Sequence, residues 1–324
     1  MLLVEFTINS VLNYLSIDGH ALTHNWKPRI IGFDAPMIGI PTDHGGYGKL
    51  EFGTIQFNPI LFQSDWPPPI NGLIEIYYTD TDEASRELVF SGIAHRNTFD
   101  REQVSYALHG PDYDETIADS TAYNDTLNVV MTAILTSIAE ITTVNTTAAR
   151  AVSPNVAHTT SGVQLAIDLA SAIAEFYSHL FYVIGDTAYL VDMKRDNGSR
   201  TLTEFQYFAF PAYPNKNPVA VARCGTFSRF STYPYGDELA VDQYHTTEAN
   251  VNAAPDDIIA LENAARSSIN IPMIAGNFVN LGEKINFTDT GNVANLTSWI
   301  RARNIRFDFM NDEINIEGEG AISA

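Results

Sequence analysis

The stretch that decides the fold runs from Glu87 to Asp119 and reads E-L-V-F-S-G-I-A-H-R-N-T-F-D-R-E-Q-V-S-Y-A-L-H-G-P-D-Y-D-E-T-I-A-D. Its first part, Leu88 to Ala94, is an apolar run of the kind that forms β-strands. A second, half-buried strand is predicted further on, because large apolar side chains alternate there with small or polar ones. The apolar positions of this alternation are Val104, Tyr106 and Leu108. We therefore expect two neighbouring strands joined by the polar loop Asn97 to Gln103.

Gly110 and Pro111 end the second of these strands. Proline lacks the N–H group that a β-ladder needs, and glycine tolerates the backbone geometry of turns. After this stop the alternation disappears, and two segments with helical periodicity follow. The stretch therefore predicts a boundary near residue 110 between an N-terminal β-domain and a helical insert.

The insert is expected to contain two amphipathic helices followed by a β-hairpin. Asn124 or Asp125 is predicted to cap the first helix, and a capping box that begins at Ser161 is predicted to open the second. Gly185-Asp186 is a two-residue hairpin signal between two short apolar strands. The buried helix faces would carry Leu127, Val130, Met131, Ile134, Ile138 and Ile141, and then Leu165, Leu169, Ile173, Phe176, Tyr177 and Leu180.

β-prone segments flank the insert on both sides. Residues 1–110 contain several short strands separated by turn signals, and Leu50 to Phe57 alternates as one of them; this pattern is typical of a barrel or a sandwich. Residues 193–324 return to the same character, interrupted by a short helix predicted to start at Pro255. The sequence thus predicts an α+β chain that is mainly β, with β-domains at both ends and helices between them.

The 324-residue chain is strongly acidic, with a formal net charge of −21 and a pI near 4.5. This balance argues against a surface that clamps nucleic acid, because phosphate binding needs clustered Lys and Arg. It fits a protein whose surface or enclosed lumen repels phosphate, and it equally fits an adaptation to solubility or salt. Hydrophobic residues make up 45% of the chain and charged residues 18%, which is typical of a folded protein with a core.

Cys224 is the single cysteine, so neither an intrachain disulfide nor a cysteine-based zinc site can form. The chain begins without the basic and apolar regions of a signal peptide. No segment approaches the roughly 20 uninterrupted apolar residues of a transmembrane helix. We therefore expect neither a secretory leader nor a transmembrane segment.

Motifs that would indicate catalysis or metal binding are weak. His20 and His24 have i, i+4 spacing, but they follow a hairpin turn, and on a strand they would lie about 13 Å apart. Asp289-Thr290-Gly291 matches the core of an aspartic protease motif, although such enzymes need two aspartates that share a proton. The glycine-rich segment Thr42 to Gly48 lacks the Gly-Lys-Ser/Thr ending of a phosphate loop. We predict no catalytic, cofactor-binding or metal-binding residues.

Charge clusters give the remaining candidates. Arg301, Arg303 and Arg306 form the one local basic cluster; they could line a rim and contact the acidic insert of a neighbouring subunit, or they could be solvated charge. The acidic segments Asp80 to Glu83 and Asp112 to Glu115 lack the glycine and distal glutamate of an EF-hand loop. Solvated turn carboxylates are the expected explanation for both segments.

The order of elements can be followed through six quoted segments. They are F-S-G-I-A (90–94), V-S-Y-A-L-H-G-P-D-Y (104–113), T-L-N-V-V-M-T-A-I-L (126–135), V-Q-L-A-I-D-L-A-S-A-I-A-E-F-Y (163–177), L-F-Y-V-I-G-D-T-A-Y-L-V-D (180–192) and I-N-I-P-M-I-A-G-N-F-V-N-L-G-E-K-I-N-F-T-D (269–289). This order resembles the tail hub, or baseplate hub, proteins of tailed bacteriophages and related injection machines. In that family two β-barrel-like tube domains flank helical insertions, and three copies form a ring with a pseudo-sixfold tube.

The resemblance implies a fold class of α+β, mainly β, with tube domains at 1–110 and 193–324 around a helix-helix-hairpin insert at 111–192. It implies a non-enzymatic virion component without a cofactor, a homo-oligomer with a trimer favoured, and a ring at the tail tip that joins the tail tube to tip proteins. Distal tail, tape measure and tip or fibre proteins would be its partners. DNA would pass through the channel without sequence-specific binding, and the protein would reside in the virion tail and, during assembly, in the host cytoplasm. Arg301, Arg303 and Arg306 would be subunit-interface residues.

Three alternatives remain open. A distal tail or adaptor ring protein would form a hexamer instead of a trimer. A carbohydrate-binding or receptor-binding β-protein would carry an exposed aromatic groove with two convergent carboxylates. A protease built on the single Asp-Thr-Gly triplet would lose self-processing or peptide cleavage on Asp289→Asn. The aromatic residues that bear on the second alternative are Trp66, Trp299, Tyr207, Phe208, Phe210 and Tyr213.

Overall fold

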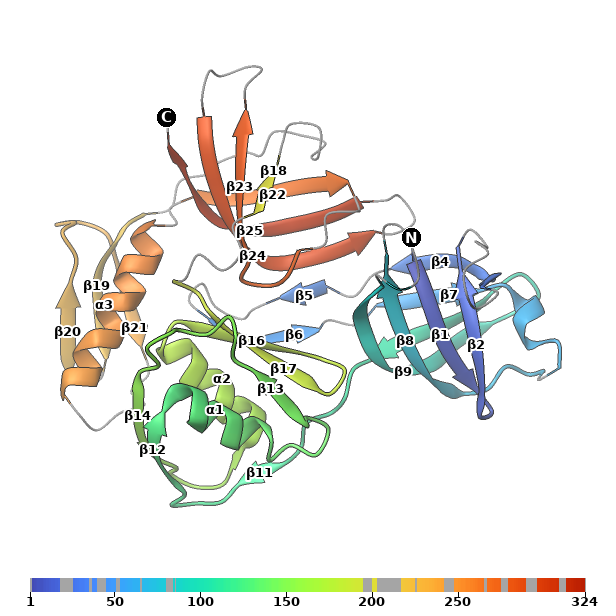
Figure 1. Cartoon of the computed structure of the whole chain (residues 1–324), viewed down its shortest axis with the longest axis horizontal. Helices are drawn as coiled ribbons and strands as arrows, with labels where there is room; N and C mark the ends of the chain where they lie inside the picture. Colours follow the sequence, from blue (N-terminus) through green and yellow to red (C-terminus); the bar gives the residue numbers. More distant parts are fainter. Residues whose placement is uncertain are drawn as a thin grey trace.

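The structure is a computed structural model that describes residues 2–17, 26–34, 37–39, 45–50, 53–64, 66–79, 84, 86–194, 200–202, 217–224, 226–241, 248–264, 267–274, 279–289, 296–308 and 313–323. Within these residues the chain is mainly β, and its helices are few. Figure 1 shows the N-terminal strands (blue to teal) as a barrel at one end of the molecule. The green insert lies beside the barrel, and the C-terminal strands (orange to red) lie above the insert.

The barrel is a nearly closed eight-stranded sheet with the order β3-β2-β1-β8-β9-β10-β7-β4. Its strands are β1 (Leu2–Ile8), β2 (Val11–Ser16), β3 (Lys27–Pro28), β4 (Ile30–Asp34), β7 (Thr54–Phe57), β8 (Asn71–Tyr78), β9 (Glu87–Phe99) and β10 (Val104–His109). β10 ends at His109, directly before Gly110-Pro111, as the sequence predicts. The predicted loop between the last two strands is shorter than expected, because β9 continues to Phe99.

Alternation within the strands fills the barrel with aromatic side chains. Phe6 stacks on Phe57 with 5.2 Å between ring centroids, and Tyr106 meets both rings edge-on. Phe62, from the 3₁₀ turn η1 (Pro59–Phe62), completes this group. All four rings are fully buried, and such aromatic pairs add to the stabilisation from their buried area.

The second sheet is an open half-barrel with the path β13-β17-β16-β6-β5-β24-β23-β18, to which β25 and β22 are attached. Its strands are β5 (Met37–Gly39), β6 (Gly46–Leu50), β13 (Thr143–Asn145), β16 (His179–Ile184), β17 (Thr187–Asp192), β18 (Arg200–Leu202), β22 (Ser267–Ile274), β23 (Lys284–Asp289), β24 (Leu296–Asp308) and β25 (Glu313–Ser323). The predicted α+β, mainly β class with two barrel-like sheets around helices is confirmed.

The β5–β6 hairpin leaves the N-terminal segment and joins the second sheet. β6 pairs in parallel with β16, and β5 pairs antiparallel with β24. The interpretation of Leu50 to Phe57 as one alternating strand is therefore wrong, because β6 and β7 belong to different sheets. The glycines of the preceding segment serve close backbone approach: Gly45 has φ +143°, and a Cβ there would collide with the carbonyl of His179.

The insert contains two helices, α1 (Leu127–Leu135) and α2 (Ala166–Phe176). Two small strand pairs border them, β11 (Thr116–Ile117) with β15 (Gln164–Leu165) and β12 (Ala122–Thr126) with β14 (Asn155–Thr159). β16 and β17 follow as the predicted hairpin, with Gly185 at φ +62° in its turn. The predicted helix faces are buried at every position except Leu165.

Both predicted helix caps are wrong. Thr126 is the N-cap of α1 and Leu165 that of α2, and neither side chain forms a capping hydrogen bond. Segments distant in sequence satisfy the first helical N–H groups instead. For α1 these are the Pro154 carbonyl (2.7 Å) and the Ser153 hydroxyl (3.0 Å). For α2 the Glu115 carbonyl accepts at 2.8 Å from Ala166.

A third, smaller layer lies on the far side of the insert from the barrel (Figure 1). Helix α3 (Glu248–Ala264) covers the sheet β20-β19-β21, made of β20 (Phe227–Phe230), β19 (Val219–Cys224) and β21 (Asp237–Val241). The prediction that this helix starts at Pro255 is wrong, since Pro255 lies inside it. Its expected apolar residues Ile258, Ile259 and Leu261 are buried, which offsets the hydrogen bond that an internal proline removes.

The hairpin β16–β17 is the wall between two hydrophobic cores. Leu180 and Val191 face the core shared by the barrel and the second sheet, whereas Phe181 and Leu190 face the core of the insert and α3. A strand that is covered on both faces reads as a continuous apolar run, as this one does. The division at residues 110 and 192 stays a prediction, and strand pairing crosses it at β6–β16 and at β5–β24.

Candidate interaction surfaces

The outer face of the barrel carries an apolar row that crosses five strands. In register, Leu12 on β2 lies opposite Thr7 on β1, Thr7 opposite Leu73 on β8, and Leu73 opposite Ile93 on β9. His109 on β10 lies opposite Ile93 and ends the row. These residues point outward because their chain neighbours, such as Phe6 and Ile74, fill the core. Leu73 is 64% exposed, which is high for a leucine in the middle of a sheet.

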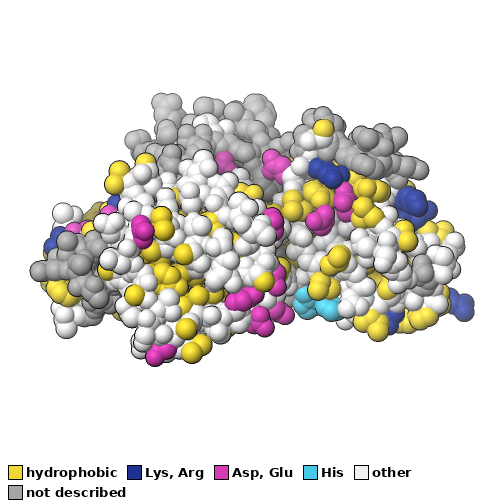
Figure 2. All heavy atoms as spheres, turned by 60° about the horizontal axis from the view of Figure 1, so that its bottom comes forward, with side chains coloured by type: hydrophobic (Ala, Val, Ile, Leu, Met, Phe, Trp, Pro, Cys, Tyr) yellow, Lys and Arg dark blue, Asp and Glu magenta, His cyan; other side chains and the backbone are white. Residues whose placement is uncertain are grey.

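This row forms the floor of a hollow of about 650 Å³ between the barrel and the insert, which we call the barrel groove. Carboxylates from both sides line it, and none of the described residues that line it is a Lys or Arg. Figure 2 shows histidine side chains (cyan) next to carboxylates (magenta) at the boundary between the two lobes. The acidic lining residues are Glu5, Glu75, Asp112 and Glu140. Arg86 pairs with Glu5 at 2.9 Å, so the groove's negative charge is partly compensated.

His95 and His109 lie side by side in the groove, with ring centroids 4.9 Å apart. Because the two residues sit 14 positions apart in the sequence, spacing alone does not indicate that they meet. The hairpin register places them diagonally on β9 and β10, since His95 pairs with Ala107 and Ile93 with His109. Within the described part of the chain, no three His, Cys, Asp or Glu side chains converge into a group able to hold a metal ion.

The end of the barrel away from the insert has a second exposed apolar surface, which we call the tip patch. Trp66 is 50% exposed and meets the Phe99 ring edge-on, with 5.6 Å between centroids. The Arg96 guanidinium lies 4.6 Å from the centre of the Phe99 ring, a cation–π geometry, and donates to the Pro68 carbonyl. Ile60 and Trp66 border a shallow hollow of about 620 Å³ that is also lined by Asn58, Pro59, Gln63, Arg101 and Glu102.

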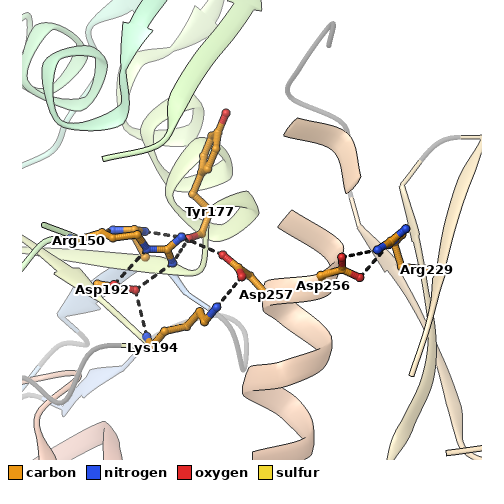
Figure 3. A network of polar contacts seen from close by, with 8 residues as sticks. Arg150, Tyr177, Asp192, Lys194, Arg229, Asp256 and Asp257 are labelled. Carbon is orange, nitrogen blue, oxygen red and sulfur yellow. Dashed lines mark hydrogen bonds and ion pairs between the residues drawn. The ribbon is translucent and has the colours of Figure 1, made fainter. Parts of the chain in front are cut away.

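The strongest polar network joins the insert to α3 (Figure 3). Arg150 forks onto Asp192 through two contacts of 3.1 Å and reaches Asp257 on α3 at 2.8 Å. Lys194 contacts the other oxygen of Asp257 at 2.5 Å. The neighbouring Asp256 is held by Arg229 on β20. Asp256 and Asp257 thus connect α3 in two directions: Asp256 to β20, and Asp257 to Arg150 and Lys194 near the end of β17.

Two titratable groups beside this network, His179 and Asp192, have shifted pKa values. Burial lowers the pKa of His179 to about 4, even though the nearby Asp192 opposes this shift. Burial alone would raise the pKa of Asp192, but the hydrogen bonds and charge of Arg150 outweigh it and hold that pKa below its usual value. The Nδ1 atom of His179 lies 2.8 Å from the Tyr177 carbonyl and Nε2 accepts from the Arg150 amide, as expected for a neutral ring. The contacts of this network join the end of β17 to helix α3.

The structure separates the three arginines predicted as subunit-interface residues. Arg301 is 5% exposed and donates to the Gly282 carbonyl at 3.0 Å, and Arg303 is 7% exposed. Arg306, further along β24, is exposed. A register shift between Ala302 and Asn304 interrupts simple alternation along this strand. Their interface role stays a prediction, and Arg306 is the member that lies on the surface of the chain.

The other candidates are scattered. Asp289 ends β23, whereas Thr290 and Gly291 lie outside the described residues, as do His20, His24, residues 42–44 of the glycine-rich segment and the acidic segment at residues 80–83. Asp112 and Asp114 are exposed, as expected of solvated carboxylates. Cys224 is buried on β19.

Among the aromatic residues that a glycan-binding site would use, the structure describes the side chain of Trp66. The hollow beside the exposed Trp66 has one carboxylate, Glu102, among its described lining residues. The carbohydrate-binding or receptor-binding alternative expects two convergent carboxylates. The cluster from Tyr207 to Tyr213 lies outside the described residues, and of Trp299 only the backbone, in β24, is described. None of the described helices is both long and apolar enough to cross a membrane.

Three solved structures are similar to nearly the whole chain, and all three are tail proteins, two of them from prophages. One is a tail protein from Neisseria meningitidis MC58, with a TM-score of 0.61, 10% identity, and coverage of 98% of this chain and 96% of the other. Another is the 43 kDa tail protein of prophage MuSo2 from Shewanella oneidensis, with a TM-score of 0.58, 8% identity, and coverage of 98% and 97%. The third is prophage tail protein gp18 from Listeria monocytogenes EGD-e, with a TM-score of 0.58, 8% identity, and coverage of 98% and 94%.

No protein-family model matches the sequence, and no curated protein matches it significantly. At identities of 8 to 10% the likeness is one of fold. The chain has the fold of these tail proteins over almost its entire length, and the resemblance drawn from the order of elements is confirmed at that level.

Proposed function

We propose that this chain is a structural protein of a bacteriophage tail, a hub subunit that forms a ring at the tail tip. The single observation that carries the proposal is the near-complete coverage, 94 to 98% of both chains, in the likeness to three tail proteins of known structure. A shared domain would cover one part of the chain, whereas here barrel, insert and half-barrel are covered together.

In this proposal residues 1–110 and 193–324 supply two tube domains, and residues 111–192 supply the insert between them. The ring joins the tail tube to tip proteins, with distal tail, tape measure and tip or fibre proteins as neighbours. The protein acts in the virion tail after assembly in the host cytoplasm. A ring requires heterologous contacts that close by rotation, and a trimer is the state that we favour.

The acidic balance supports a channel through which DNA passes without adhering. With a net charge of −21, a ring of several copies would surround its lumen with a potential that repels phosphate. Arg306 is exposed on β24 and is our first candidate for a cross-subunit charge contact among the three predicted interface arginines, since Arg301 and Arg303 are buried in the single chain. The role is structural in this proposal, and the chain carries out no reaction.

Native mass spectrometry followed by negative-stain imaging of the purified chain tests the proposal. A closed trimeric ring with a central hole is the expected result. A hexameric ring would keep the tail assignment but favour a distal tail or adaptor protein. A monomer at every concentration, together with binding to host-surface glycans, would favour the carbohydrate- or receptor-binding alternative, and Trp66 is the exposed aromatic residue that such binding would use.

A further inference from the structure

We propose that the tip patch of one copy docks into the barrel groove of the next, so that the ring is held by one repeated head-to-tail contact. The inference rests on the proposed ring and names the two surfaces that would form its interface. Neither surface is needed to complete the fold of the single chain, because the side chains involved point away from both hydrophobic cores.

The groove is a preformed receptor with an apolar floor and an acidic rim. Leu12, Leu73 and Ile93 are 42%, 64% and 40% exposed, and the strand register fixes them in one row. Exposed apolar patches rimmed by polar residues mark association sites. The hollow of about 650 Å³ falls within the range of volumes found for ligand pockets, so it is large enough to receive a few side chains of a partner.

The tip patch has the composition of an anchor. Tryptophan and arginine dominate the few residues that carry most of the affinity in protein interfaces. The Trp66 ring packs edge-on against the Phe99 ring, and the Arg96 guanidinium lies over the same Phe99 ring. Ile60, which is 46% exposed and lines the same hollow as Trp66, extends the apolar surface.

Charge explains why a second copy is the occupant that fits. Two copies that each carry −21 repel one another unless their contact places cations against carboxylates. Arg101 lines the tip patch, and the carboxylates of Glu75, Asp112 and Glu140 line the groove. Glu102 also lines the hollow at the tip patch, so the two cations of that surface, Arg96 and Arg101, face one carboxylate of their own.

The placement of the two surfaces makes the contact heterologous. The groove lies where the barrel meets the insert, and the Pro59–Phe62 turn beside the tip patch lies at the opposite end of the barrel (Figure 1). Each copy therefore offers one of each surface, and a head-to-tail contact between two copies leaves one free tip and one free groove, whereas a reciprocal two-fold pair would leave neither. Such contacts generate rings when the rotation closes.

Two surface variants and a matched control test the inference. The groove variant is Leu73→Glu with Ile93→Glu, and the tip variant is Trp66→Ala with Arg101→Ala. The control, Val129→Glu with Val163→Glu, adds the same charge as the groove variant at exposed positions of the insert, where the wild-type side chains are 51% and 68% exposed. Glu75→Lys is a second groove variant, to be used if the first does not fold.

We expect the control to form the wild-type ring and each surface variant to associate at least about 100-fold more weakly, as loss of an interface anchor predicts. The decisive measurement is an equimolar mixture of the two surface variants. The intact tip of the groove variant should dock into the intact groove of the tip variant, giving a 1:1 heterodimer that cannot extend to a ring. Native mass spectrometry resolves this species from monomers and rings.

The outcomes separate this inference from the proposed ring. Rings formed by both surface variants would overturn the docking contact and leave the ring proposal standing. Monomeric variants that fail to form the heterodimer would also overturn it, because the contact would then be isologous or lie elsewhere. A wild-type chain that stays monomeric at every concentration would overturn both. A tip variant that assembles normally but loses glycan binding would assign the tip patch to a glycan, against the inference.

Discussion

The barrel and the insert differ in what they leave on their surfaces. Among the described residues, nine of the fifteen large hydrophobic side chains that remain exposed lie within the barrel segment, residues 2–109. The insert, residues 111–192, has ten carboxylates and a single Lys or Arg, Arg150, which is held in the network with α3. The barrel thus presents apolar surface to the outside, whereas the insert presents negative charge.

This difference shows that the two regions satisfy their apolar side chains differently. Burial of the insert's apolar faces is completed inside the chain, by α1, α2, the hairpin wall and α3. The barrel completes a core as well, yet it keeps a second, outward apolar row that its own fold does not use. Surface apolar residues that gather in a patch are typical of association, and a negatively charged surface is typical of solubility and repulsion.

The largest effect is expected from a change inside the barrel core. Phe57→Ala removes a fully buried ring that packs on Phe6, Phe62 and Tyr106, and should lower the free energy of unfolding by about 3–5 kcal/mol. Urea denaturation measures this loss. Phe230→Ala is the matched control, because Phe230 is 73% exposed on β20 and its removal should change little.

Hydrogen exchange on the same Phe57→Ala variant sharpens the comparison. Protection should fall in the barrel strands first, since α1 and α2 belong to the other hydrophobic core. Equal loss of protection in the barrel and in the two helices would show that the two cores unfold as one unit and that the distinction between them has no energetic meaning.

Arg150→Ala should have the next largest effect. It leaves Asp192, which is 5% exposed, without its forked partner, and we expect a loss of about 2–3 kcal/mol after allowing for the partial exposure of the arginine. Arg150→Lys should restore only part of the lost stability. The lysine keeps the positive charge beside Asp192, but its ammonium group cannot make the two-armed contact of the guanidinium. Arg223→Ala, which breaks an exposed pair with Glu238, is the control and should unfold like the wild type. Equal unfolding midpoints for the Arg150→Ala and Arg223→Ala variants would contradict the assigned role of the network.

Mild acid should destabilise the insert through His179. Its pKa is lowered to about 4 in the folded chain, so between this value and the ordinary value near 6.5 the unfolded chain binds the proton and the folded chain does not. Acidification therefore favours the unfolded chain. The free energy of unfolding should fall by about 1 kcal/mol between pH 7.5 and pH 5.5 through this histidine. Asp192, whose pKa is also lowered, adds to the loss at lower pH because protonation ends its pairing with Arg150.

Urea midpoints measured across this pH range provide the check. In His179→Gln the dependence between pH 7.5 and pH 5.5 should become flatter, whatever the variant's stability at neutral pH. An unchanged slope would assign the acid sensitivity to other groups.

The smallest effect on folding is expected on the outer face of the barrel. Leu73→Ser should change the free energy of unfolding by no more than about 0.5 kcal/mol, because the side chain is 64% exposed. Ile74→Ser, one residue further along the same strand, is the matched control: Ile74 is 1% exposed, and its loss should cost about 2–5 kcal/mol. Similar losses for the two variants would mean that Leu73 serves the fold and is not available to a partner.

Sequence patterns located most helices and strands, but they did not predict which distant segments of the chain contact one another. The helix faces, the hairpin at Gly185-Asp186 and the end of β10 could be predicted because periodicity and turn chemistry are local. The caps of α1 and α2 could not, since Ser153, Pro154 and Glu115 supply them from distant segments. The candidate surfaces were missed for the same reason: Leu12, Leu73, Ile93 and His109 form one row only through the register of five strands. Trp66 was singled out as an aromatic residue, but its support by Phe99 required the folded barrel.

By itself, the sequence determined the alternation of β-rich and helical regions, the end of the β10 strand before Gly110-Pro111 and the acidic character of residues 111–192. Only the tertiary structure decided that the β5–β6 hairpin leaves the barrel segment for the second sheet, that Arg301 and Arg303 are buried while Arg306 is exposed, and that His95 meets His109. The physical reason is that side-chain periodicity states which residues share a face of a strand. Backbone hydrogen bonds, which are alike in every strand, leave the choice of neighbouring strand to the packing of the whole chain.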